Sequence, residues 1–147
     1  MRAPYTQLYV HVVWATRDRL PLITPELELR VYGVILEKCR ALKAYPLALG
    51  GMPDHVHLMV RLPTTLAVAE LVKGVKGASS HLLTQMVAPG EFFKWQGGYG
   101  AFTVAKADIS RCMAYIRGQK QHHADDQLDT EWETIASAND AETGFEA

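Results

Sequence analysis

Apolar and polar residues alternate along several short stretches of the chain, and each stretch predicts a β-strand. Residues 5–15 are rich in β-branched and aromatic types, which favour extended backbone. Successive side chains of a strand point to opposite faces, so Val10, Val12 and Trp14 would share one face and His11 would lie on the other. This first stretch therefore predicts a strand with one apolar face.

Three further strands are predicted downstream, over residues 45–51, 55–62 and 101–104. The end of the second strand breaks into a turn at Gly50-Gly51-Met52-Pro53-Asp54, and the short spacing to the third strand is typical of an antiparallel hairpin. In the third strand Val56, Leu58 and Val60 alternate with His55, His57 and Met59. The apolar set is expected to enter the core.

Helical periodicity separates these strands. Thr24 followed by Pro25 starts a helix that we expect to end near Lys43. A second helix is expected from a Thr64 or Thr65 cap to about residue 86, and a third over residues 108–122. The element order then matches the split βαβ, or ferredoxin-like, pattern. We predict an α+β fold with a four-stranded antiparallel sheet, two helices on one face and an additional C-terminal helix.

Charge is unevenly distributed along the chain. The 147 residues have a formal net charge of −1, but residues 125–147 hold eight acidic and no basic residues. Residues 1–124 therefore carry a net charge of +7, which favours a polyanionic partner such as nucleic acid. We predict one domain over residues 1–124 and an acidic, partly disordered tail over 125–147, in which Trp132 and Ile135 could dock a short helix.

Composition limits the class of protein further. Hydrophobic residues make up 48% and charged residues 21% of the chain, as in globular proteins. No apolar run approaches the roughly 20 residues of a membrane span, and the N-terminus lacks the apolar region of a secretory signal. Two distant cysteines, Cys39 and Cys112, suit a reducing compartment. We expect a cytoplasmic protein without a membrane partner.

The pair His55 and His57 is the strongest chemical signal in the sequence. Residues i and i+2 of a strand face the same way, about 6–7 Å apart, so two neutral imidazoles could converge on one cation. A His-x-His pair alone is also compatible with two histidines on a solvent-facing sheet surface, because a two-residue match has low specificity.

Four segments together resemble the small single-tyrosine HUH transposases of insertion sequences and their REP-associated relatives. The segments are Tyr9-Val10-His11-Val12-Val13-Trp14-Ala15-Thr16, Met52-Pro53-Asp54-His55-Val56-His57-Leu58-Met59-Val60, Trp95-Gln96-Gly97-Gly98-Tyr99-Gly100-Ala101-Phe102 and Tyr115-Ile116-Arg117-Gly118-Gln119-Lys120-Gln121-His122-His123. They occur in the family's order and cover roughly residues 5–123. The acidic tail matches no motif of the family.

The resemblance implies a specific chemistry. Tyr115 would be the nucleophile, and His55, His57 and Gln119 would hold a divalent metal, Mg²⁺ or Mn²⁺. Tyr115 and Gln119 are four residues apart and so share one helix face. Family members cleave and rejoin single-stranded DNA at hairpin-bearing ends through a 5′-phosphotyrosine, without a nucleotide cofactor. They act as homodimers in which the catalytic helix can serve the partner's HUH strand.

Several residues are candidates for contacts with DNA, and for each one an ordinary surface or packing role is the competing interpretation. The candidates are His11, Arg17, Arg19, Lys73, Lys76, Lys106, Arg111, Arg117 and His122. His11 could instead support the metal strand. His122 and His123 are interpreted as helix-end or DNA-contacting residues rather than metal ligands.

Three other functions remain open from the sequence. A ferredoxin-like module could hold single-stranded nucleic acid without cutting it. A small metal-dependent hydrolase could use the two histidines with Tyr115 incidental. A domesticated relative could process repeated hairpin sequences instead of moving its own element. For any of the DNA-directed functions we expect a cytoplasmic protein associated with the nucleoid of a prokaryote.

Overall fold

A computed structural model of the chain describes residues 4–86, 93–124 and 132–135. Its elements, in chain order, are β1 (Tyr9–Ala15), η1 (Arg17–Arg19), α1 (Pro25–Ala41), β2 (Tyr45–Met52), β3 (His55–Arg61), α2 (Val68–Met86), β4 (Gly100–Thr103), η2 (Lys106–Asp108), α3 (Ile109–Arg117) and α4 (Gln119–Ala124). Within the described residues no helix is long and apolar enough to cross a membrane.

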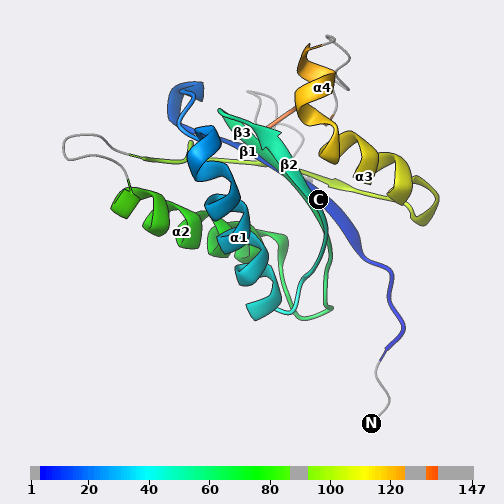
Figure 1. Cartoon of the computed structure of the whole chain (residues 1–147). Coiled ribbons are helices and arrows are strands. Elements are labelled where there is room, and N and C mark those ends of the chain that lie inside the picture. The colour runs from blue at the N-terminus through cyan, green and yellow to red at the C-terminus, as the bar shows by residue number, and fades with distance from the viewer. Residues whose placement is uncertain (1–3, 87–92, 125–131, 136–147) are drawn as a thin grey trace, which may run out of the picture.

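The four strands form one antiparallel sheet in the order β2-β3-β1-β4. The central pair is β1 and β3, in which Val13 lies opposite His57 and Ala15 opposite His55. This is the sheet that the sequence predicts, and the α+β fold with its extra C-terminal helix is confirmed (Figure 1).

The two faces of the sheet carry different layers. Val12, Trp14 and Leu58 belong to a buried core shared with α1 and α2. On the opposite face Met59 packs with Ile116 of α3 in a second cluster. Figure 1 shows α1 and α2 on one side of the sheet and α3 and α4 on the other. The alternation in β1 and β3 therefore separates a purely apolar core from a face that carries the histidines.

Element boundaries differ from the prediction at three places. The first strand begins at Tyr9 rather than residue 5, and the second helix begins at Val68 because residues 64 and 65 form a turn. The third helix, predicted over 108–122, is two helices that meet at Gly118. Glycine is a poor helix former because its backbone loses the most entropy on ordering, which accounts for the break at this position.

Two glycines allow backbone to approach the histidine-bearing face closely. A Cβ atom at Gly50 of β2 would stand 2.2 Å from the carbonyl oxygen of Ile116, and one at Gly100 of β4 would stand 2.0 Å from that of Thr134. No other residue fits at such distances. Gly50 thus lets the C-terminal end of α3 lie on β2, and Gly100 lets the described C-terminal segment, residues 132–135, lie on β4.

We expect Gly50→Ala to destabilise the protein by about 1–3 kcal/mol, the usual cost of overpacking a tight contact. The measurement is the free energy of unfolding from urea titration. Gly33→Ala is the matched control: it lies within α1, where an added Cβ meets no atom within 4 Å. Alanine should stabilise that helix by about 0.5–1 kcal/mol. Equal stability of the Gly50→Ala variant and the parent would contradict the close packing of α3 on β2.

Candidate active site and metal centre

The N-terminal end of β3 places His55 and His57 on the same sheet face, and each imidazole is oriented through its Nδ1 atom. His55 Nδ1 lies 2.7 Å from Oδ1 of Asp54 and donates to that carboxylate. His57 Nδ1 lies 2.8 Å from Nε2 of His11. These contacts leave both Nε2 atoms directed into one site. Metal-ligating histidines are commonly held in this way by a partner on the other ring nitrogen.

His11 is fully buried under this site. Its ring centroid lies 5.1 Å from that of His57 and 5.5 Å from that of Trp132. Its contact with His57 and its burial set the ring of His11 against the strand that carries His55 and His57 and away from solvent.

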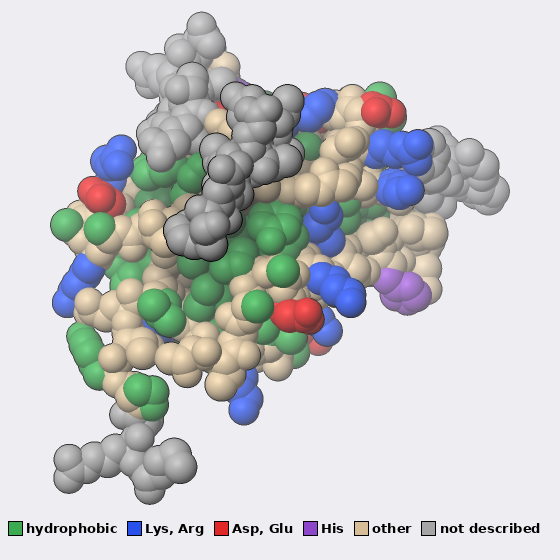
Figure 2. All heavy atoms as spheres, turned by 180° about the vertical axis from the view of Figure 1, so that it is seen from behind, with side chains coloured by type: hydrophobic (Ala, Val, Ile, Leu, Met, Phe, Trp, Pro, Cys, Tyr) green, Lys and Arg blue, Asp and Glu red, His purple; other side chains and the backbone are tan. Residues whose placement is uncertain are grey.

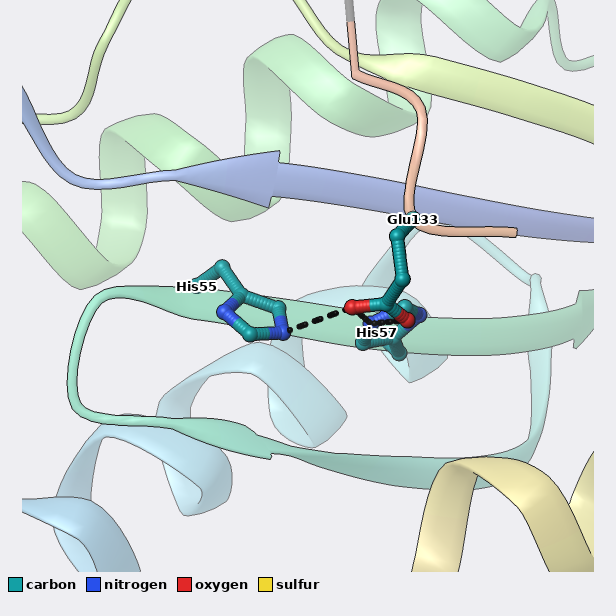
Figure 3. Close-up of side chains that lie close together, drawn as sticks. All are labelled: His55, His57 and Glu133. Carbon is teal, nitrogen blue, oxygen red and sulfur yellow. Dashed lines mark hydrogen bonds and ion pairs between the residues drawn. The ribbon is translucent and has the colours of Figure 1, made fainter. Parts of the chain in front are cut away.

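Glu133 from the C-terminal segment projects between the two histidines (Figure 3). Its carboxylate oxygens lie 3.2 Å from His55 Nε2 and 3.0 Å from His57 Nε2. One ligand atom from each of the three residues lies within 4.8 Å of the others. This cluster has the composition and spacing of a cation site.

Tyr115 of α3 points its hydroxyl at the same carboxylate. The hydroxyl donates to Glu133 Oε2 at 2.7 Å, and the tyrosine ring lies 6.0 Å from the ring of His57, centroid to centroid. Tyr115 is 8% exposed. Its neighbour on the site side is the indole of Trp132, whose ring lies 5.1 Å away. One chain thus brings the tyrosine hydroxyl to the histidine pair.

Gln119, the first residue of α4, completes the group. Its Oε1 lies 3.3 Å from His55 Nε2 and 3.1 Å from His123 Nε2, while its amide nitrogen donates to the carbonyl oxygen of Tyr115. The side chain is 1% exposed. The break at Gly118 therefore leaves Gln119 directed at His55, as a ligand of a cation bound there would have to be.

The electrostatics of the site follow from burial and from these contacts. Burial lowers the pKa of His55, but its hydrogen bonds to Asp54 and Glu133 outweigh burial and raise the pKa to about 9. For His57 burial dominates and lowers the pKa, while burial and the charge of His57 lower the pKa of His11 to about 3. Burial would raise the pKa of Glu133, but the hydrogen bonds from His55 and His57 hold it well below its usual range.

The donor set suits a divalent cation. The Nε2 atoms of His55 and His57, the amide oxygen of Gln119 and the carboxylate of Glu133 offer two nitrogens and two kinds of oxygen donor. Carboxylate and carbonyl oxygens suit Mg²⁺ and Mn²⁺, and imidazole is accepted by Mn²⁺ and other transition metals. A cation would also replace the proton that His55 otherwise holds, because an imidazolium cannot be a ligand.

Sequence reasoning missed three members of the site. Asp54 lies in the sequence motif around His55, but the sequence predicted no function for its carboxylate. His123 was interpreted as a helix-end or DNA-contacting residue, and the structure places its Nε2 3.4 Å from Glu133 Oε1. Glu133 lies in the acidic tail, where no local pattern distinguishes it from its neighbours. The short helix expected around Trp132 and Ile135 is wrong for residues 132–135, which form a turn followed by irregular backbone; the rest of the predicted tail lies outside the described residues.

The predicted DNA-contacting residues fall into groups. Arg19 pairs with Asp54 at 3.4 Å, and the guanidinium of Arg111 stands 4.6 Å from the ring centroid of Trp132, so both flank the site. Arg117 donates to the carbonyl oxygen of Leu47, and Lys76 donates to the backbone at Gln96 and Gly98. Three others are exposed: Arg17, Lys73 and Lys106. The side chain of His122 lies outside the described residues.

Basic side chains are more frequent than acidic ones on the face opposite to the view of Figure 1 (Figure 2). They stand at several separate places around an apolar area rather than in one continuous patch. On this face the basic side chains are therefore spread out. Of the predicted set, Arg19 contacts Asp54 and Arg111 contacts Trp132, both beside the histidine site.

Both a protein-family model and a curated protein match this chain. The family model described as "Transposase IS200 like" matches residues 4–119. A curated relative, the ISDra2 transposase TnpA of Deinococcus radiodurans, is 24% identical over 120 residues, which cover 77% of this chain and 84% of that protein.

Two solved structures share the fold. A putative transposase from Deinococcus radiodurans R1 superposes with a TM-score of 0.65 and 22% identity, over 86% of this chain and 95% of that one. A REP-associated tyrosine transposase bound to a REP hairpin superposes with a TM-score of 0.61 and 16% identity, over 100% of this chain and 87% of that one. The family match contains His55, His57, Tyr115 and Gln119 and ends before Glu133.

We expect Glu133→Gln to weaken Mn²⁺ binding by about tenfold or more, as is typical when a residue that supports a metal site is replaced. The amide keeps the size of the side chain and removes its negative charge. The measurement is isothermal titration of Mn²⁺ into the protein in the absence of DNA. Glu37→Gln, an exposed position on α1, is the control and should bind Mn²⁺ as the parent does. Unchanged Mn²⁺ affinity in the Glu133→Gln variant would rule out a contribution of this carboxylate.

Proposed function

The chain belongs to the family of IS200-like transposases, and we propose that it cleaves and rejoins single-stranded DNA through a covalent link between Tyr115 and a 5′-phosphate. One observation carries this proposal: the hydroxyl of Tyr115 is held 2.7 Å from a carboxylate that also contacts both histidines of the candidate metal centre. The nucleophile and the cation ligands thus share one site.

A phenol needs such an arrangement because its free pKa of about 10 leaves it a weak nucleophile at neutral pH. The phenolic oxygen of Tyr115 would form a bond to phosphorus as the bond from phosphorus to the 3′-oxygen breaks, and the hydroxyl proton would pass to solvent. The released strand takes up a proton as a 3′-hydroxyl, and the other strand stays on Tyr115 as a phosphodiester.

A divalent cation, Mg²⁺ or Mn²⁺, supplies Lewis-acid polarisation of the phosphate when bound. His55, His57 and Gln119 would hold it, with Glu133 as an anionic donor. His11 and Asp54 orient the two imidazoles, and Gln119 also bonds to the backbone of Tyr115. The chain's own residues therefore keep the nucleophile and the cation ligands in a single preorganised group.

Rejoining would reverse these bond changes. A 3′-hydroxyl, from the same or another strand, attacks the phosphotyrosine and releases Tyr115. Because one phosphodiester replaces another at each step, the reaction needs no nucleotide cofactor.

For the substrate we propose single-stranded DNA with hairpins. Support comes from the net charge of +7 in residues 1–124 and from a structural neighbour that was solved with a REP hairpin. Arg19 and Arg111 flank the site and would contact backbone phosphates close to the scissile bond. A protein with this activity would act in the cytoplasm on the nucleoid.

We further propose a homodimer joined at β4. The segment Gly100–Thr103 pairs with β1 on one side, and within the described residues no strand pairs with its other side. It carries neither charge nor proline, so nothing in it opposes pairing with a second copy. The site is assembled within one chain in this structure, and the family resemblance suggests that partners can exchange α3.

The central test is the covalent adduct. Incubated with Mn²⁺ and a hairpin-bearing single strand, the parent protein should form a protein–DNA band that survives a denaturing gel. Tyr115→Phe should abolish cleavage and the adduct and change DNA affinity by less than about twofold, because the phenyl ring keeps its packing and only the nucleophile is lost.

Each alternative has its own outcome in this assay. A non-catalytic binding module would leave the DNA intact, and a metal-dependent hydrolase would cut it without an adduct. An adduct formed by the Tyr115→Phe variant would overturn the assignment of the nucleophile.

Subunit complementation tests the shared site. A Tyr115→Phe chain and a His57→Ala chain should each be inactive, and after verified exchange they should regain cleavage if the tyrosine of one copy serves the histidines of the other. Inactive mixtures show that each chain uses its own tyrosine. A monomer by sedimentation at micromolar concentration would contradict the dimer itself.

A further inference from the structure

A cavity of about 460 Å³ opens beside the candidate active site, and Glu133 forms part of its wall. The other walls come from Arg19 of η1, from Gln96 and Gly97 of the segment that precedes β4, and from residues 134 and 135. The volume lies within the range of small-ligand sites. Because Glu133 contacts Tyr115, the cavity adjoins the position where a scissile phosphate would react.

The loop that carries Arg19 has a conformation that requires explanation. Asp18 and Arg19 have φ angles of 55° and 56°, the left-handed region that residues other than glycine seldom adopt. Hydrogen bonds hold this shape: the hydroxyl of Thr16 donates to the carbonyl oxygen of Leu20 at 2.6 Å, and the backbone N–H of Asp18 donates to Oε1 of Gln96 at 3.0 Å. Backbone strain that is retained in this way is characteristic of functional sites.

The opposite wall is equally constrained. The Gln96 backbone N–H donates to the carbonyl oxygen of Ala15, and the Lys76 ammonium donates to the carbonyl oxygens of Gln96 and Gly98. Next to Gln96, the buried indole of Trp95 donates to the hydroxyl of Ser79. The cavity is thus built before any ligand arrives, which lowers the entropic cost of binding.

Arg19 and Gln96 offer hydrogen-bond donors on the cavity wall, and Glu133 offers an acceptor. Since the oxygen of the Gln96 amide accepts from Asp18, the amide nitrogen is the end that remains to donate. Arg19 uses its Nε on Asp54, and within the part of the chain that the structure describes its two terminal nitrogens have no ion-pair partner. Two donors on the wall of one cavity match a base edge that presents two acceptors.

We propose that this cavity binds the base of a nucleotide that flanks the scissile phosphate, and that Arg19 and Gln96 select guanine at that position. The inference rests on the proposed function, because it assumes a single strand that passes Tyr115. Guanine presents O6 and N7 as adjacent acceptors, whereas adenine presents an amino donor beside N7. An unstacked base in a single strand exposes this edge to side chains. Adenine would set its amino group against the donors of Arg19 and Gln96.

The key variant is Gln96→Glu. It keeps an oxygen for the Asp18 N–H and replaces the amide nitrogen by a second oxygen, so the cavity changes from donor to acceptor at one point without a change of size. Gln85→Glu is the matched control, because Gln85 is an exposed residue near the end of α2 that bonds to His81 and lies outside the cavity.

In the first experiment the parent and both variants cleave a pool of hairpin-bearing single strands with randomised flanks, and the ends of the products are sequenced. We expect guanine to be enriched about tenfold over adenine at one position next to the cut, in line with the discrimination of a bidentate contact. Gln96→Glu should lose this enrichment, and Gln85→Glu should retain it. A parent profile without base preference at the cut, or the same profile in the Gln96→Glu variant, overturns the proposal.

A second experiment separates this inference from the catalytic proposal. The Tyr115→Phe protein, with and without Gln96→Glu, selects strands from the same pool by binding in the presence of a chelator. Guanine selection that depends on Gln96 supports the cavity even if the parent protein forms no adduct. If the parent protein cleaves DNA but neither experiment shows guanine selection that depends on Gln96, the proposal for the cavity is wrong and the catalytic proposal stands.

Discussion

The antiparallel register between β1 and β3 is the constraint on which the candidate site depends. It sets Val13 opposite His57 on the sheet, so that the imidazole of His11, two residues earlier in β1, reaches Nδ1 of His57. A shift by one residue would exchange the two faces of the strand. The histidines would then enter the apolar core under α1 and α2, and Val56 and Leu58 would face the site. Burial of the apolar face of the sheet under α1 and α2 therefore also determines that the histidines lie on the opposite face.

The buried imidazole of His55 is paired with anions, because burying an unpaired charge is costly. Asp54 supplies one on the sheet, next to His55 in the chain. Glu133 supplies the other from a segment that lies outside the family match. Its approach is possible because Gly100 leaves room for the backbone of Thr134. Charge complementarity and one close backbone contact together explain why the segment lies over β4.

The same network connects the metal centre to its surroundings. Asp54 accepts from His55 and pairs with Arg19, and Arg19 lines the cavity that adjoins Glu133. Groups that would orient a cation ligand and groups that would contact a strand of DNA are therefore neighbours. Side-chain networks of this kind are worth more than their separate contacts, because each member holds the next in its productive orientation.

The fold and the centre of the site were predictable from local patterns. Alternation in β1 and β3 and helical spacing elsewhere follow from covalent geometry that any stretch of chain carries with it, and they predicted the strands, the helices and the facing of His55 and His57. The motif around Tyr115 placed Gln119 on the same helical face, although the break at Gly118 was missed, because a single glycine within a helical pattern is often tolerated.

Two features were decided only by the tertiary structure. Glu133 is one of eight acids in the last 23 residues, and nothing in its sequence neighbourhood singles it out. Its role depends on a return of the chain across the sheet, a contact whose partners are 76 residues apart. Lys76 was a candidate for contact with DNA. Its ammonium group instead donates to backbone carbonyl oxygens of a loop that begins 20 residues later in the chain. Local periodicity determines which face a side chain takes, whereas long-range contacts depend on how distant segments pack, and that information resides in no single segment.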